Sequence, residues 1–381
     1  MKKRPIILTA LLVCALIILA SATGCGGGKR PGPVTGTIVH EPEFGGVYIS
    51  YTIDEFNALG YVYGDSVDIL FSNGYELTDI PYYNGFYTEN GQLLLVAYPG
   101  YDDIKVCINS GDDLWDVAGL RDTDTAEITL HEGGKYKDIQ DAQNISYTDI
   151  RGDYASDEIF ANFRSVKAGN IAEGTLYRSA SPCDDQHKRA AYVNELAEEA
   201  GIRCIIDLAD NEDKIQGYLA KEDFNCPYFL KLYENGDVIP LALDMKFTSD
   251  SFRSRLCAGL TAMTAREGPY LVHCTEGKDR TGFVCMLLEA LCGASYDEIV
   301  DDYMITYYNY YKITEESDPG RYTVIVEHLL DPMIQLLFDE PGVDIQTADL
   351  SQGARQYLMS TGMNEAEIDA LAAVLTERSD R

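Results

Sequence analysis

Residues 273–282, with the sequence HCTEGKDRTG, bring a cysteine, two basic and two acidic side chains into one short segment. The apolar run at 270–272 predicts a buried strand before this segment, and the apolar run at 283–291 predicts a helix after it. The segment is therefore expected to form a tight loop on a helix N-terminus. Backbone N–H groups that lack a helical partner bind anions at such a place. The spacing predicts a loop that binds phosphate.

Four side chains of this loop have chemistry that suits phosphoryl transfer. A free thiol ionises near about pH 8.5 and more readily at a helix N-terminus, so we expect Cys274 to act as a thiolate nucleophile. The planar guanidinium of Arg280 can hold two phosphate oxygens, and the hydroxyl of Thr281 can donate to the sulfur as it leaves. His273 has two interpretations, a support that bonds loop carbonyls or a histidine that is merely packed.

The segment resembles the signature loop of the cysteine-dependent tyrosine and dual-specificity phosphatases. Its HCxxGKDRTG form is similar to that of a bacterial branch with secreted tyrosine and phosphoinositide phosphatases, and its Asp-Arg pair resembles the myotubularin group. The segments NFR at 162–164, GTLYRS at 174–179 and CIIDL at 204–208 resemble further patterns of that branch. The likeness covers residues 155–376, with departures at Ser165 and Ala209, where the branch commonly has an acidic and a basic residue.

This resemblance implies a phosphomonoesterase that works through a phosphocysteine intermediate and needs no cofactor and no metal. It also implies that the substrate phosphate contacts the loop from one end to the other, at Thr275, Glu276, Gly277, Lys278, Asp279, Arg280 and Thr281. Glu276 stands where a small residue is frequent, so its carboxylate is expected to disfavour highly phosphorylated substrates. Lys278 either contacts a second phosphate, as in phosphoinositide-directed relatives, or only raises the local positive potential.

Two aspartates compete for the role of the acid that protonates the leaving oxygen. Asp279 lies inside the loop, and the resemblance to the bacterial and myotubularin-like branches favours it. Asp244 lies about where other members carry the aspartate of a mobile acid loop, and the stretch 241–246 is a candidate for that loop. The alternative interpretation, which we favour over this role, is that Asp244 is an ordinary solvated aspartate.

The N-terminal residues indicate export. A basic start at 1–4, an apolar stretch at 6–20 and the box Ala22-Thr23-Gly24-Cys25 resemble a bacterial lipoprotein signal, in which Cys25 receives the lipid. Residues 26–34 are rich in glycine and proline and predict a flexible tether. An uncleaved anchor is the alternative, and both interpretations place the protein on the outer side of a bacterial membrane.

The composition restricts the partners. A net charge of -32 argues against nucleic acid and against long-range attraction of phosphorylated substrates, so association is expected to speed up with salt. The 10 cysteines show neither zinc-ligand spacing nor a compact disulfide framework. The expected partners are a phosphorylated protein or a phosphoinositide, together with the membrane that holds the lipid anchor.

The chain divides into two predicted domains. Residues 35–150 contain alternating segments at 47–51, 66–71, 92–97 and 104–108, separated by glycine-rich turns, and predict an all-β domain. Its aromatic segment 81–87 either covers a sheet or forms a binding face for an unknown ligand. Residues 151–381 alternate strands and helices and predict a three-layer α/β catalytic domain that resembles the tyrosine phosphatases. Capping boxes at Ser295 and Asn364 predict helices over 296–313 and up to residue 375.

Two other functions remain open from the sequence. The chain can be a surface-anchored protein that binds phosphate or glycan with little activity, although the intact Cys274, Asp279 and Arg280 argue against this. A rhodanese or an arsenate reductase uses a similar cysteine loop, but the GKDRTG half of the segment disfavours both.

Overall fold

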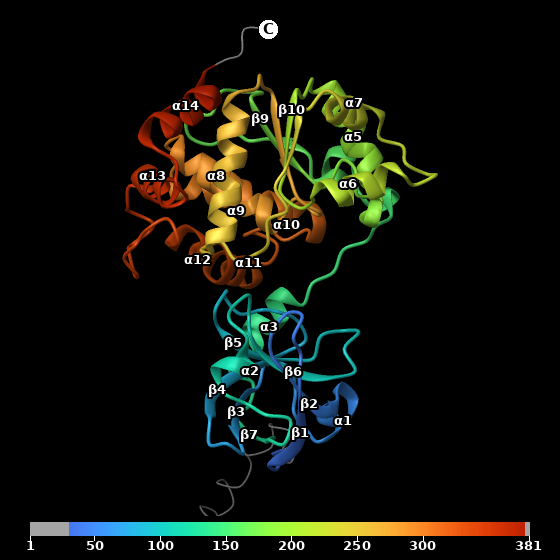
Figure 1. Cartoon of the computed structure of the whole chain (residues 1–381), viewed down its shortest axis with the longest axis vertical. Helices are drawn as coiled ribbons and strands as arrows, with labels where there is room; N and C mark the ends of the chain where they lie inside the picture. The colour runs from blue at the N-terminus through green and yellow to red at the C-terminus, as the bar shows by residue number, and fades with distance from the viewer. Residues whose placement is uncertain (1–29, 378–381) are drawn as a thin grey trace, which may run out of the picture.

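The structure is a computed structural model that describes residues 30–377. The predicted signal segment, Cys25 and most of the predicted tether lie outside the described residues. In residues 30–377, no helix combines the length and the apolar character that crossing a bilayer requires. Figure 1 shows two bodies, a smaller one built from the N-terminal part of the chain and a larger one built from the rest.

The smaller body is a closed β-barrel with strand order β1-β2-β6-β5-β4-β3-β7. Its strands are β1 (Val34–His40), β2 (Val47–Thr52), β3 (Ser66–Phe71), β4 (Glu76–Tyr83), β5 (Leu93–Val96), β6 (Asp103–Ile108) and β7 (Thr125–Glu132). The four predicted strands of this region are confirmed as β2, β3, β5 and β6. Three short helices accompany the strands, so the region is not purely β: α1 (Ile53–Ala58), α2 (Leu114–Val117) and α3 (Lys137–Gln143).

Alternation along the strands explains the core of the barrel. Val47 and Ile49 on β2 and Val67 and Ile69 on β3 are fully buried, as a period of two predicts for side chains that face the interior. Tyr82 and Tyr83 of the aromatic segment 81–87 are buried too. These two tyrosines therefore belong to the packed interior, while Phe86 stays partly exposed.

The larger body contains a sheet with strand order β11-β10-β12-β9-β8. Its strands are β8 (Arg164–Ser165), β9 (Leu176–Ser179), β10 (Cys204–Asp207), β11 (Val238–Pro240) and β12 (Tyr270–His273). The strands β9, β12, β10 and β11 run parallel, and β8 pairs antiparallel to β9. The predicted strand at 270–272 is thus confirmed, and it is the middle strand of the sheet.

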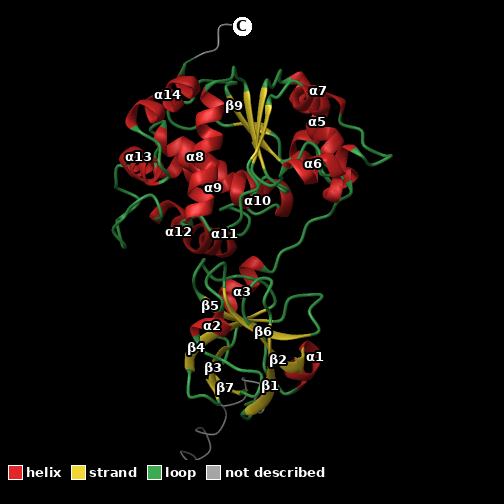
Figure 2. Ribbon diagram, viewed as in Figure 1, coloured by secondary structure: helices red, strands yellow, loops and turns green. Residues whose placement is uncertain are grey.

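Helices cover both faces of this sheet (Figure 2). Val272 and Ile206 pack into a core with α8 (Asp250–Thr264) and α9 (Asp279–Leu291), whereas Leu271 and Ile205 pack against helices on the opposite face. That second group comprises α5 (Ala190–Glu199), α6 (Glu212–Leu219) and α7 (Pro227–Glu234). Adjacent residues of a buried parallel strand face opposite sides, which is why both Leu271 and Val272 are apolar.

The C-terminal part adds further helices around α9. They are α10 (Tyr296–Tyr311), α11 (Pro319–Ile325), a π-helical turn η3 (Val326–Leu330), α12 (Asp331–Gln335), α13 (Leu350–Ser360) and α14 (Glu365–Thr376). The predicted capping boxes at Ser295 and Asn364 are confirmed at the starts of α10 and α14. The short α4 (Asp157–Ala161) precedes β8.

Candidate active site

The predicted phosphate loop lies between β12 and α9, as expected. Cys274 directly follows the last residue of the middle strand and is 3% exposed. Gly277 has a φ of +70°, and a Cβ atom there would lie 2.2 Å from the carbonyl oxygen of Ser179. Only glycine fits this position, because any side chain would both strain the backbone and collide with β9.

The carbonyls of the loop are held outward by residues from several elements. The backbone N–H of Ser181 donates to the carbonyl of Thr275 at 3.1 Å, and the hydroxyl of Tyr310 on α10 donates to that of Glu276 at 2.7 Å. Arg178 on β9 and Asn162 both donate to the carbonyl of Gly277, at 3.1 and 3.2 Å. In a trans peptide the N–H points opposite to the C=O, so the loop N–H groups are turned the other way.

Those N–H groups remain available. From residue 275 to residue 280, no backbone N–H donates a hydrogen bond to any group within the described part of the chain. They sit at the N-terminus of the 13-residue helix α9, whose dipole adds to their positive field. Six consecutive backbone donors without a partner in residues 30–377 therefore directly follow Cys274.

A buried ion network fixes the residues that hold the loop. Asp302 on α10 accepts from Arg178 at 2.6 Å and from Arg164 on β8 at 2.9 Å. Burial by itself would raise the pKa of Asp302, but the two guanidinium groups outweigh it and hold that pKa well below its usual range. Arg164 also donates to the Asn162 side chain at 2.8 Å, so the network reaches the loop through Arg178 and through Asn162.

Arg280 lies on the first turn of α9 and is held by two acceptors. Its Nη1 donates to the carbonyl of Leu243 at 3.1 Å, and its Nη2 donates to the hydroxyl of Thr275 at 3.4 Å. The segment 241–246, predicted as an acid loop, therefore contacts the predicted phosphate-binding arginine. Asp244 is exposed on that segment, and its carboxylate accepts from the backbone N–H of Lys246 at 2.8 Å.

Asp279 and Lys278 form a charged group at the rim of the loop. Lys278 Nζ lies 3.7 Å from a carboxylate oxygen of Glu276 and 3.8 Å from one of Asp279. The surrounding protein desolvates Asp279 in part and raises its pKa, although 43% of the side chain stays exposed, and the charge of Lys278 offsets only part of this rise. Desolvation would lower the pKa of Lys278, but the carboxylates of Asp279 and Glu276 contribute to an opposite, larger effect, and the net pKa is raised.

His273 and Thr281 are both fully buried beside the loop. His273 Nδ1 lies 3.3 Å from the carbonyl oxygen of Cys274. Burial lowers the pKa of His273 to about 4, so the neutral ring donates to that carbonyl near neutral pH. The hydroxyl of Thr281 has no hydrogen-bond partner within residues 30–377 and is free to donate to another acceptor.

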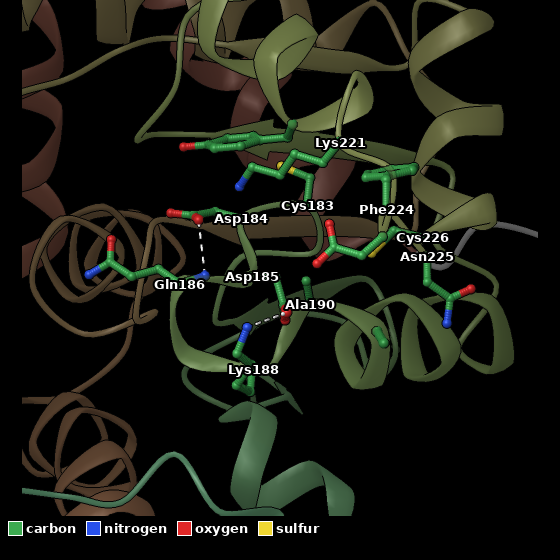
Figure 3. Close-up of a pocket in the computed structure, with 13 residues that line it drawn as sticks. Cys183, Asp184, Asp185, Gln186, Lys188, Ala190, Lys221, Phe224, Asn225 and Cys226 are labelled. Atoms are coloured by element: carbon green, nitrogen blue, oxygen red, sulfur yellow. Dashed lines mark hydrogen bonds and ion pairs between the residues drawn. The ribbon is translucent and has the colours of Figure 1, made fainter.

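A second group of reactive side chains lies outside the loop. Cys183, Asp207 and Asp210 are buried. The Sγ atom of Cys183 and one carboxylate oxygen of each aspartate lie within 4.8 Å of one another. Burial raises the pKa of Asp207 to about 6 and also raises that of Asp210. Cys183 borders a cavity of about 720 Å³, and none of the 13 residues that Figure 3 draws around this cavity belongs to the loop 273–282.

The comparisons with known proteins agree with this geometry. The family model described as "Tyrosine phosphatase family" matches residues 160–377, which is more than half of the chain. The chain belongs to the tyrosine phosphatase family. The predicted resemblance is confirmed at this level, and the finer assignment to a branch with phosphoinositide phosphatases stays a prediction. A search of curated proteins finds no match.

Three solved structures are similar to parts of this tyrosine phosphatase family member. An uncharacterized conserved protein from Thermotoga maritima shares 22% identity over 26% of this chain and 36% of its own, with a TM-score of 0.23. TpbA from P. aeruginosa shares 16% identity over 62% of this chain and 99% of its own, with a TM-score of 0.23. A cysteine-to-serine variant of TpbA in complex with pTyr shares 16% identity over 45% and 92%, with a TM-score of 0.25.

Several residues of the site were not singled out from the sequence. Asp302, Tyr310 and Ser181 hold the loop or its supports, but they lie on α10 and after β9, far from the loop in sequence. Asn162, Arg164 and Arg178 were noticed as parts of a family pattern without a role. No local pattern in the sequence marks Asp302 as the partner of Arg164 and Arg178, because only the fold brings the three together.

Proposed function

We propose that this chain is a cysteine-dependent tyrosine phosphatase that hydrolyses phosphotyrosine through a phosphocysteine intermediate. The observation that carries the proposal is the loop itself. Its carbonyls are tied outward, its N–H groups are free, and Cys274 lies at its base. Such a cradle binds a phosphoryl group and stabilises the charge that spreads over its oxygens in the transition state.

The reaction would proceed in two steps. In the first, Cys274 Sγ attacks phosphorus, the S–P bond forms, the P–O bond to tyrosine breaks, and Asp279 protonates the leaving oxygen. In the second, water attacks phosphorus, Asp279 takes the proton from that water, and the thiolate leaves with the phosphate released. The free hydroxyl of Thr281 would stabilise the departing sulfur, and Arg280 would hold two phosphate oxygens in both steps.

The charges at the rim bear on the substrate class. Lys278 Nζ lies 3.7 Å from a carboxylate oxygen of Glu276, which compensates its charge even while Asp279 is protonated. A second phosphate of a phosphoinositide or an inositol polyphosphate would approach the negative Glu276 as well as Lys278. We therefore favour phosphotyrosine over phosphoinositides as the substrate.

Phosphate release by the chain and by its Cys274→Ser variant tests the proposal. The substrates are phosphotyrosine and phosphoserine peptides, each phosphoinositide and inositol hexakisphosphate. We expect release from phosphotyrosine that disappears in the variant, and acid quenching should trap a phosphate on the wild-type protein but not on the variant. If no substrate releases phosphate under reducing conditions, the result would instead support the alternative that the chain binds phosphate or glycan with little activity.

The pH dependence tests the assignment of the acid. Because the pKa of Asp279 is raised in the free protein, the carboxyl stays protonated to higher pH than usual, and kcat/KM should fall as pH rises through that pKa. Asp279→Asn should remove this limb and lower kcat on phenyl phosphate by about 100-fold or more, and less on a substrate whose leaving group needs no proton. Asp244→Asn is the matched control. A loss confined to Asp244→Asn would assign the acid to Asp244.

We also propose that the protein is a lipoprotein on the outer side of a bacterial membrane. The proposal depends on the signal-like residues 1–25, and Cys25 would carry the lipid. Cys25→Ser should abolish incorporation of labelled fatty acid and should change the fraction of protein in the membrane pellet. Unchanged labelling of the variant would contradict it.

A further inference from the structure

A cavity of about 360 Å³ lies between the barrel and the catalytic domain, next to the loop 273–282. Lys278 and Asp279 of that loop line the cavity, so it borders the proposed phosphate site. Its volume falls in the range of about 300–1,000 Å³ that is usual for sites of small organic groups. In Figure 1 the end of the barrel with β5 and α3 faces α11 and α12.

The barrel is tied to the catalytic domain around this cavity. The side-chain amide of Asn90 donates to the carbonyl of Met245, and Lys246 Nζ donates to the carbonyl of Gly111 at 3.2 Å. Both bonds join barrel loops to the segment that also contacts Arg280 through Leu243. The barrel therefore lies beside the part of the catalytic domain that borders the phosphate loop.

Tyr87 connects the barrel most directly with the loop. It lines the cavity together with Lys278. Burial raises the pKa of the Tyr87 hydroxyl, and the positive charge of Lys278 opposes that rise, as expected for neighbouring groups. Tyr87 of the barrel and Lys278 of the loop thus stand on the wall of the same cavity.

The two walls of the cavity differ in chemistry. The catalytic domain contributes an apolar wall, which includes Met245, Phe247, Leu329 and Met333. The barrel contributes Phe86 and a set of polar groups, among them Thr88, whose buried hydroxyl has no hydrogen-bond partner within residues 30–377. A peptide suits both walls, because an apolar side chain can pack on one and the backbone amides can bond to the other. An acyl chain would leave the polar wall unpaired, which costs free energy.

We propose that this cavity binds an apolar side chain next to the phosphotyrosine of a peptide substrate, and that the barrel thereby determines substrate specificity. The inference rests on the proposed phosphatase activity. The net charge of -32 points the same way, because acidic residues beside the phosphotyrosine would be repelled and apolar ones would not.

The test compares kcat/KM of the full chain on p-nitrophenyl phosphate and on two phosphotyrosine peptides, with leucine or with serine beside the phosphotyrosine. We expect the leucine peptide to be preferred about tenfold, in line with partial burial of one leucine side chain. Phe86→Ser on the barrel wall should reduce that preference to about twofold or less, and Met245→Ser on the opposite wall should reduce it too. The matched control is Phe44→Ser, an exposed phenylalanine that does not line the cavity.

Each outcome has one meaning. Equal preference for both peptides, or a preference that Phe86→Ser and Met245→Ser leave intact, would overturn the inference while the activity on p-nitrophenyl phosphate upholds the proposed function. A Phe86-dependent preference for phosphoinositide vesicles over both peptides would also overturn it. If p-nitrophenyl phosphate is not hydrolysed, the proposed function fails. Binding of the two labelled peptides to Cys274→Ser, with and without Phe86→Ser, then decides the inference without turnover.

Discussion

The catalytic domain and the barrel each contain a basic side chain that is almost completely buried and that holds a loop. In the catalytic domain, Arg178 is 1% exposed, pairs with Asp302 and donates to the carbonyl of Gly277. In the barrel, Lys105 is 1% exposed and pairs with Glu41, whose carboxylate accepts from the backbone of the turn between β1 and β2. A buried ion pair is costly to desolvate in both places.

The difference lies in what the held loop carries. The turn at Glu41 presents backbone and exposed side chains, whereas the loop at Gly277 presents free N–H groups around a cysteine. A buried ion pair alone therefore does not distinguish the two regions, whereas the groups on the loop that it holds do.

The largest effect is expected for Asp302→Ala. The change leaves Arg164 and Arg178 buried without their counter-charge, which should lower the free energy of unfolding by about 3–5 kcal/mol. The loop would also lose its anchor, so kcat on p-nitrophenyl phosphate should fall at temperatures where the variant is still folded. Urea denaturation measures the free energy of unfolding, and steady-state kinetics measures kcat. Asp301→Ala, an exposed neighbour, is the control, and an equal loss in both variants would contradict the role of Asp302.

Glu41→Ala should affect the stability of the barrel without affecting catalysis. The change leaves the buried Lys105 without its counter-charge and should lower the free energy of unfolding of the barrel by about 3 kcal/mol. We expect the lower end of the range for a broken buried ion pair because Glu41 keeps some access to water. At temperatures where the barrel stays folded, kcat on p-nitrophenyl phosphate should not change. Glu43→Ala, on the same turn but exposed, serves as the control. A parallel loss of kcat would show that the barrel turn does influence the catalytic loop.

The smallest effect is expected for Asn162→Gly. Asn162 has a φ of +50°, which glycine adopts without strain, so the change removes the side-chain bonds and keeps the backbone. The loss of bonds to Gly277 and Arg164 should lower the free energy of unfolding by about 1–2 kcal/mol. A slight displacement of the loop should lower kcat by about tenfold with little change in KM. An unchanged kcat would show that Arg178 alone positions Gly277.

Much of the site was predictable from local sequence because its chemistry is local. The strand at 270–272 and the helix over 283–291 follow from apolar runs, although the helix begins four residues earlier, at Asp279. The left-handed backbone of Gly277 was visible only in the structure. The helix starts at Ser295 and Asn364 follow from capping residues three positions apart. The contact of Arg280 with Leu243 was not predictable, because it joins positions 37 residues apart.

The sequence by itself determined the family and the strand–loop–helix order around Cys274, because each depends on residue types at short, fixed spacings. Only the tertiary structure decided which residues hold the loop open and where the barrel stands. Asn162, Arg178, Asp302 and Tyr310 meet around Gly277 and Glu276 because β8, β9 and α10 pack together, and no local pattern encodes that meeting. The barrel loop at 86–90 reaches the cavity beside Lys278 for the same reason: the contact is made by packing between domains, not by neighbouring residues of the chain.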